Sequence, residues 1–231
     1  MNRRSFLVLA ATLPLTGCLP ERHSWRQKLT LLIETPGGEV SGSGVVAVGV
    51  NFYENPPPLT ATEVEYSMTG EATVVEVLPG KYLFALLGGS QELFAIAAKD
   101  RFAGMTRGEW LREIPKQTEP VTLPGDLIPM LVTFEDITRP ETVREVDPAD
   151  LAASFGPGVR LKAVTLEITD EPMTVGRVEG LLGWWFNMRS GPYNEMTPLK
   201  LPNSSPWGWN HLGALQFWSL DQVQKFNRTK Q

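Results

Sequence analysis

KLTLLIE, residues 28–34, is the stretch that decides the fold, because its side chains suit an extended backbone with two different faces. Leu29, Leu31 and Ile33 fall on one face of a β-strand, and that apolar face must pack against another layer. Pro36 and the glycines that follow it then turn the chain, and a second strand is expected over residues 39–50. The sequence therefore predicts two strands joined by a turn at this point of the chain.

Further strands are expected to join this pair. Residues 71–78 and 81–87 favour β-structure, and the Pro79-Gly80 pair between them suits the central positions of a type II turn, which predicts a hairpin. Three more strands are expected, at residues 93–98, 127–134 and 160–169.

Short helices are expected between the strands. Thr106 and Glu109 have the spacing of a capping box, and Asp147 followed by Pro148 is typical of a helix start. Weaker helical patterns occur at residues 174–182 and 219–227. These elements predict an α+β fold that is β-rich, with a mainly antiparallel sheet and a few short helices.

The composition indicates a folded, acidic domain. Hydrophobic residues make up 42% of the chain, and the formal net charge is −5. Nucleic acid is not an expected partner, because binding to phosphates needs a basic surface. Cys18 is the only cysteine, so an intramolecular disulfide, a thiolate metal site and a cysteine nucleophile are all excluded.

The N-terminal segment is typical of a signal peptide. Arg3 and Arg4 form a basic region, and an apolar run over residues 6–15 follows that is too short to span a bilayer. Leu15-Thr16-Gly17-Cys18 resembles the lipobox of bacterial lipoproteins. The resemblance implies a signal peptide at residues 1–17, acylation of Cys18, and a lipid bilayer as the partner of the acylated cysteine.

Cleavage before Cys18 would leave 214 residues with a formal charge of −7. We expect a lipidated tether at residues 18–25 and a single β-rich domain at residues 26–231. Fully extended, residues 19–25 would reach about 25 Å, so the domain is expected close to its membrane.

The export route and the leaflet are indicated by neighbouring residues. Arg3-Arg4-Ser5-Phe6-Leu7 resembles a twin-arginine signal, but Asn2 and Val8 depart from that pattern, so both this route and the general one stay open. Leu19 stands where an inner-membrane retention signal has aspartate. The resemblance therefore implies the periplasmic side of the outer membrane rather than the inner one.

A second resemblance covers residues 129–134, 143–162 and 168–174. These segments are similar to a family of uncharacterised bacterial proteins, many of which are predicted lipoproteins. The resemblance implies a recurrent domain and carries no catalytic residue with it.

The usual catalytic motifs are incomplete in this sequence. The glycines of residues 42–49 have the wrong spacing for a phosphate loop, and a β-branched run follows them instead of a helix. Only His211 could serve a serine triad or a site in the domain, and a lone histidine among aromatic residues is more often a packing residue. We expect no metal and no cofactor, because the ligands for a zinc site are missing.

Carboxylates leave one enzymatic alternative open. Two facing acids could hydrolyse a glycosidic bond. The candidate acids are Glu135, Asp136, Asp147, Asp150, Glu167, Asp170 and Glu171. Neighbouring acids on a strand point to opposite faces, however, and acids at a helix start have a capping role, so structural roles are favoured.

The C-terminal segment, residues 183–218, is rich in aromatic residues, with five of the seven tryptophans. Trp207, Trp209 and His211 are the candidate surface for a glycan or an envelope protein, because aromatic faces on a Pro- and Gly-rich loop can form a platform. The alternative is that the tryptophans of this segment fill the core.

We therefore expect a membrane-anchored lipoprotein of the cell envelope that acts by binding or as a structural protein rather than as an enzyme. An envelope glycan hydrolase is the first alternative. A periplasmic inhibitor or immunity lipoprotein is the second, because an acidic domain suits a basic partner.

Overall fold

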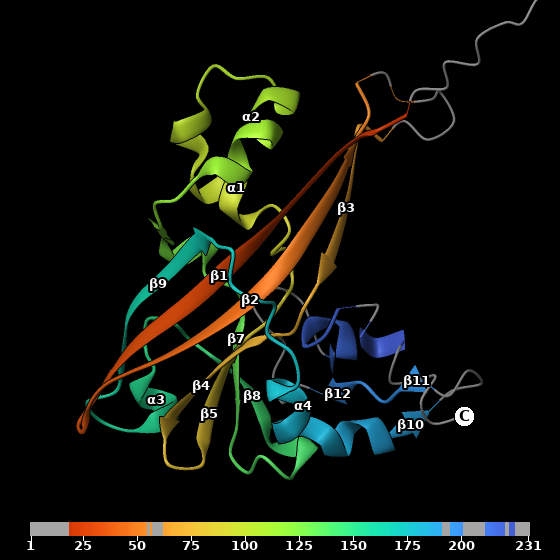
Figure 1. Ribbon diagram of the computed structural model, residues 1–231. Helices are drawn as coiled ribbons and strands as arrows, with labels where there is room; N and C mark the ends of the chain where they lie inside the picture. The colour runs from red at the N-terminus through yellow and green to blue at the C-terminus, as the bar shows by residue number, and fades with distance from the viewer. Residues whose placement is uncertain are drawn as a thin grey trace, which may run out of the picture.

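The computed structural model describes residues 19–54, 56, 62–190, 195–200, 211–219 and 222–224, with only the backbone of residues 189, 190, 195, 196 and 211. This part of the chain forms two large antiparallel sheets, two small two-stranded sheets and several short helices (Figure 1). The prediction of a β-rich α+β fold is therefore confirmed.

The first large sheet, here called the outer sheet, has the strand order β3-β2-β1-β9-β6. Its strands are β1 (Glu21–Thr35), β2 (Gly38–Phe52), β3 (Val64–Thr69), β6 (Val121–Thr122) and β9 (Arg160–Ile168). β1 and β2 contain the two strands that the sequence predicts, and they form a long antiparallel pair in which Leu31 and Ile33 are fully buried. β1 begins at Glu21, however, inside the segment expected to be a tether.

The second large sheet, here called the middle sheet, has the order β4-β5-β7-β8. Its strands are β4 (Thr73–Leu78), β5 (Lys81–Ala85), β7 (Leu131–Phe134) and β8 (Val143–Val146). The predicted hairpin is confirmed, since β4 pairs with β5 and Gly80 has a φ of +73° in the turn between them. All four residues of β7 are buried, because this sheet is covered on both faces.

The outer and middle sheets approach closely where β2 meets β4. A Cβ atom at Gly42 would lie 2.5 Å from the carbonyl oxygen of Val74, and one at Gly44 would lie 2.5 Å from Oγ1 of Thr73. Side chains at these positions would overlap β4, so glycine permits the approach. The glycines are thus part of a strand, as predicted, and allow two sheets to pack.

The helices are short. The α-helices are α1 (Leu93–Ala97), α2 (Arg107–Glu113), α3 (Ala152–Phe155) and α4 (Arg177–Leu182). The 3-10 helices are η1 (Lys99–Phe102), η2 (Ile114–Lys116), η3 (Gly125–Leu127), η4 (Pro140–Thr142), η5 (Gly183–Asn187) and η6 (Ala214–Gln216). None of the helices in the described part of the chain is long and apolar enough to cross a bilayer.

Two predictions around the helices are wrong. Residues 93–98, expected as a strand, form α1, in which the amide of Ala98 donates to the carbonyl of Phe94 at 2.9 Å. Alanines within this short apolar run favour a helix over a strand. Asp147 does not cap α3, since that helix starts at Ala152 and it is Asp150 that accepts from the amide of Ala153 at 3.1 Å.

The capping box at Thr106 is confirmed. The Thr106 hydroxyl accepts from the amide of Glu109, and the Glu109 carboxylate accepts from the amide of Thr106 at 2.7 Å. Both bonds satisfy N–H groups that the first turn of α2 leaves unpaired.

The far face of the middle sheet is covered by what we call the aromatic layer, which comprises α4, η5 and residues 212–218. Trp185, Phe217 and Trp218 are fully buried there. The ring centroids of Trp185 and Phe217 lie 5.1 Å apart at 76°, and those of Trp185 and Trp218 lie 5.5 Å apart at 64°. For these tryptophans the core alternative is correct.

The middle sheet therefore divides two hydrophobic cores. Val75, Leu83 and Leu131 point into the first core, which the outer sheet and α1 close. Phe84 and Val132 point into the second, which the aromatic layer closes. Small hairpins complete this side, formed by β10 (Arg189–Ser190) with β11 (Glu195–Met196) and by β12 (Leu199–Lys200) with β13 (His211–Leu212).

Candidate functional site

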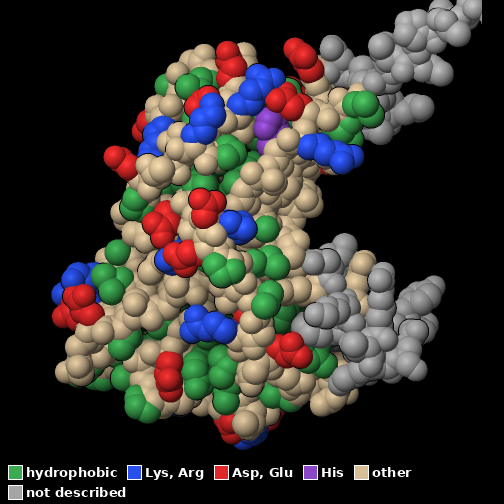
Figure 2. All heavy atoms as spheres, viewed as in Figure 1, with side chains coloured by type: hydrophobic (Ala, Val, Ile, Leu, Met, Phe, Trp, Pro, Cys, Tyr) green, Lys and Arg blue, Asp and Glu red, His purple; other side chains and the backbone are tan. Residues whose placement is uncertain are grey.

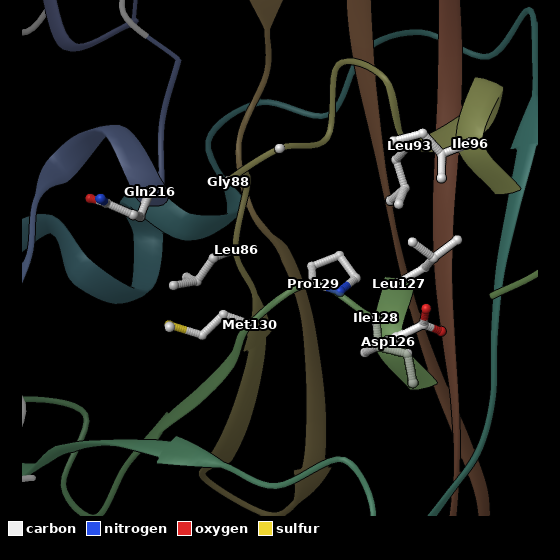
Figure 3. Close-up of a pocket in the computed structure, with 11 residues that line it drawn as sticks. Leu86, Gly88, Leu93, Ile96, Asp126, Leu127, Ile128, Pro129, Met130 and Gln216 are labelled. Carbon is white, nitrogen blue, oxygen red and sulfur yellow. The ribbon is translucent and has the colours of Figure 1, made fainter. Parts of the chain in front are cut away.

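An apolar pocket of about 320 Å³ lies in the described part of the chain. Leu93 and Ile96 of α1 point toward Leu127 across it (Figure 3). Pro129 and Met130 line it on the side of the middle sheet. We call this hollow the apolar pocket and define it by residues 86, 88, 89, 93, 96, 126–130 and 216.

The apolar pocket lies where the two cores meet. Leu93 belongs to the first core, and Leu86 belongs to the second. Gln216 of the aromatic layer also borders the pocket, and its side chain points away from Leu93 and Leu127 (Figure 3). The pocket is thus bounded by three separate parts of the chain, as is common for ligand sites.

The chain segment at residues 86–90 that borders the pocket is fixed by hydrogen bonds. The amide of Leu86 donates to the carbonyl of Met130 at 3.0 Å, and the amide of Leu87 donates to the carbonyl of Gln216 at 2.8 Å. The buried Gln27 side chain donates to the carbonyl of Ser90 at 2.6 Å. These bonds come from three directions, so the pocket wall is preformed.

Asp126 is the one charged side chain that lines the apolar pocket, and it is exposed to solvent. Leucine, isoleucine, proline and methionine supply most of the remaining wall. Binding of an aliphatic group to such a lining is favourable, because it removes apolar surface from water. The lining residues of the pocket include no nucleophile and no pair of facing acids.

The acids that could have formed a hydrolase site have structural partners instead. Glu135 pairs with Arg144, and Asp136 accepts from the amide of Thr138 at 2.9 Å. The hydrogen bonds from the Thr138 hydroxyl and amide lower the pKa of Asp136.

The remaining candidate acids are engaged in the same way. Asp147 accepts from the amide of Ala149, Asp150 caps α3, and Asp170 pairs with Arg26. Glu167 and Glu171 both pair with Lys28, at 3.4 and 2.5 Å. The structure brings together Glu167 and Glu171 only through this lysine, which holds them as ion-pair partners.

Glu71 is the buried acid that the sequence analysis missed. Its side chain is 1% exposed, and it accepts from the amides of Gly176, Arg177 and Val178 at 3.0, 2.9 and 3.3 Å. Burial raises the pKa of Glu71, and the three amide donors act in the opposite direction. The carboxylate caps the first turn of α4 from a distant part of the chain, which no local sequence pattern could indicate.

Most of the residues predicted to carry the lipid anchor or to bind a partner lie outside the described part of the chain. Arg3, Arg4, Cys18, Trp207 and Trp209 are outside the described residues. Of His211 only the backbone is described, in β13. The proposed aromatic surface and the lipidation site therefore stay predictions.

In the described part of the chain, no group of three or more His, Cys, Asp or Glu residues could hold a metal ion.

The residues of the apolar pocket, like Glu71, were missed by the sequence analysis. The breaks at Gly88-Gly89 and at Pro124-Gly125 are the available signals, since they interrupt the strands beside the pocket.

Comparisons with known proteins found no protein-family model, no curated protein and no solved structure that matches this chain. The function is therefore argued from the chain's own residues.

Proposed function

We propose that this protein is a membrane-anchored lipoprotein of the bacterial cell envelope and that it acts by binding an apolar group rather than by catalysis. The observation that carries the binding role is the apolar pocket, with its volume of about 320 Å³. Its size and lining are in the range of ligand pockets, which are mostly apolar with few polar groups. The lipid anchor is supported by the order of basic residues, apolar run, small residues and Cys18.

The ligand that fits this lining is an aliphatic group with little or no negative charge. Leu93, Ile96 and Leu127 would surround such a group, while Asp126 at the pocket would repel an anion and favour a cation. Each methylene removed from water contributes about 0.8 kcal/mol, so a short aliphatic chain or a large apolar side chain of a partner could bind with useful affinity.

Binding of a fluorescent aliphatic amine to the purified domain tests the pocket. Ile96→Arg should weaken binding at least tenfold, because it places a cation at the wall of the pocket. Ile96 is 46% exposed, so the fold should tolerate the change. Val175→Arg is the matched control, since Val175 is 58% exposed and does not line the pocket. Equal affinity in both variants would contradict the proposed site.

Mass spectrometry of the N-terminal peptide tests the anchor. We expect a mature chain that begins at an acylated Cys18 and that partitions into membranes. Cys18→Ser should abolish acylation and membrane partition together. A mature protein with an unmodified Cys18 would overturn the anchor.

A further inference from the structure

Only Leu19 and Pro20 separate Cys18 from Glu21, the first residue of β1. Three residue steps reach about 11 Å at most. Pro20 fixes its own φ and disfavours a helical conformation at Leu19, so this link is short and extended. If Cys18 is acylated, as proposed above, the bilayer lies within this reach of the start of β1.

The start of β1 lies at one end of the outer sheet. Glu21 is opposite Phe52, the last residue of β2, and Phe52 is opposite Val64, the first residue of β3. α2 lies near the same end of the sheet (Figure 1). The β1–β2 turn is at the other end, and 15 residues at about 3.4 Å each separate the two ends by roughly 50 Å.

An ion pair joins the start of β1 to α2. Nε of Arg112 donates to Oε1 of Glu21 at 2.7 Å, and Nη2 of Arg112 donates to Oε2. The hydrogen bond to Arg112 lowers the pKa of Glu21. This two-point contact adds to the pairing of β1 with β2 in holding the first residue of β1 on the body of the domain, so it opposes fraying of the strand and lengthening of the free link.

Most of the described side chains exposed at this end of the domain are polar. Acidic and basic groups are intermixed around α2 (Figure 2). Arg107 pairs with both Glu63 and Glu92, and the exposed Glu54 adds a further carboxylate. Leu19 in the link and Met105 before α2 are the exposed large apolar side chains among the described residues of this end. A surface dominated by charges of both signs suits hydrated headgroups, and its described residues show no excess of cations that would attract anionic lipids.

We propose that the end of the domain formed by the start of β1, the end of β2, the start of β3 and α2 is its membrane-facing surface. The lipid anchor holds this surface against the phospholipid headgroups. The Glu21–Arg112 pair keeps the distance between the surface and the headgroups short. The contact is imposed by the short link and not by affinity of the surface. The β1–β2 turn and the body of the domain therefore extend away from the bilayer.

Energy transfer on the acylated full-length protein tests this orientation. Because Cys18 is the only natural cysteine and is blocked by acylation, an introduced cysteine is a unique labelling site. Glu54→Cys places a donor fluorophore at the membrane-facing surface, and Glu39→Cys places it near the β1–β2 turn as a matched glutamate control. The vesicles contain phosphatidylcholine and phosphatidylglycerol, with acceptors on the headgroups.

We expect strong transfer from residue 54 and weak transfer from residue 39. Arg112→Gln should reduce transfer from residue 54, and Glu21→Gln, which removes the same pair from its other side, should give the same change. Arg139→Gln is the control, because it removes an exposed ion pair with Glu141 at equal change of charge.

The outcomes separate the two proposals. Acylated protein with equal transfer from both sites, or with stronger transfer from residue 39, overturns this orientation and leaves the proposed function standing. Protein that is not acylated at Cys18 overturns the anchor itself and the orientation with it. If Arg112→Gln and Glu21→Gln leave transfer unchanged, the role of the ion pair is wrong. A Cys18→Ser protein that still binds these vesicles would show that the surface has an affinity of its own, against the proposal.

Discussion

Glu71 connects the segment between β3 and β4 to α4 and to the C-terminal part of the chain. It lies between β3 and β4, caps α4 through three amide hydrogen bonds, and forms a β-bridge with Trp218. A buried carboxylate is costly unless its oxygens are fully paired, and here backbone donors supply the pairing. The aromatic layer is thus fixed to the middle sheet at a polar point inside an otherwise apolar contact.

Replacing Glu71 by alanine should be among the most destabilising substitutions in the chain. Three amides would lose their acceptor, and that of Val178 is buried, as is the cavity left by the side chain. An unsatisfied buried group costs about 1–3 kcal/mol, so we expect a loss of about that size in the free energy of unfolding. Urea denaturation followed by circular dichroism measures this loss. Glu119→Ala, at an exposed glutamate, should change stability by less than about 0.5 kcal/mol. A similar result for both variants would contradict the capping role.

Glu71 should also make stability depend on pH in an unusual direction. Its pKa is raised in the folded protein above the ordinary value of 4.5, so the folded state binds this proton more readily than the unfolded state does. Stability contributed at this site is therefore greatest at low pH and decreases as pH rises from 4.5 through the raised folded pKa.

Comparing the wild type with Glu71→Gln over this pH range isolates the effect, since glutamine does not titrate. The difference in unfolding free energy, wild type minus variant, should become smaller as pH rises. Glu21 provides the opposite control, because Arg112 lowers its pKa and its contribution is lost as pH falls below 4.5 through the lowered folded pKa. If the difference in unfolding free energy from the wild type changed with pH in the same direction for Glu71→Gln and Glu21→Gln, the account of Glu71 would be wrong.

At the scale of elements, the approach of β2 to β4 depends on glycine. Gly42→Ala would place a methyl group 2.5 Å from both the Val74 carbonyl oxygen and Cβ of Val75, so the sheets would have to separate. We expect a loss of about 1–3 kcal/mol, the usual cost of overpacking. Gly37→Ala in the β1–β2 turn is the control, because its methyl group would meet only Oγ1 of Thr35, at an ordinary 3.7 Å. Thermal denaturation of both variants measures the difference.

Local patterns predicted those elements whose cause is local. The alternation around Leu31 predicted β1, the Pro79-Gly80 turn predicted the β4–β5 hairpin, and Thr106 predicted the start of α2. β3 was not predicted, because its half-buried residues owe their strand conformation to pairing with β2. The helix α1 was mistaken for a strand because a short apolar run has no clear period.

The apolar pocket could not be predicted for a related reason. Leu86, Leu93, Leu127 and Gln216 come together only when α1, η3 and the aromatic layer have packed around the ends of β5 and β7. Each of these residues in isolation looks like an ordinary core or loop residue.

For the whole molecule, the shared middle sheet should make the two cores unfold together. Val75 and Leu83 hold one core and Phe84 and Val132 the other, on opposite faces of the same four strands. Loss of either core would expose one apolar face of the sheet, so a half-unfolded state has little to stabilise it.

Fluorine NMR of protein labelled with fluorotryptophan can follow both cores in one urea titration. Trp25 reports the first core and Trp185 the second, with assignments from Trp→Phe variants. The native signals of both should disappear with the same midpoint, which far-UV circular dichroism should reproduce. Loss of the Trp185 signal at clearly lower urea would show that the aromatic layer is a separate folding unit.

The second core can be completed only after the C-terminal residues of the aromatic layer have been synthesised. The amide of Ala72 donates to the carbonyl of Phe217, and the amide of Ser219 donates to the carbonyl of Gly70. About 70 residues separate the end of β8 from Phe217 and Trp218, which a ribosome adds in roughly 4–14 s at about 5–20 residues per second. During those seconds Phe84 and Val132 lack the residues that cover them, so we expect the nascent chain to expose apolar side chains that a chaperone for apolar segments can bind.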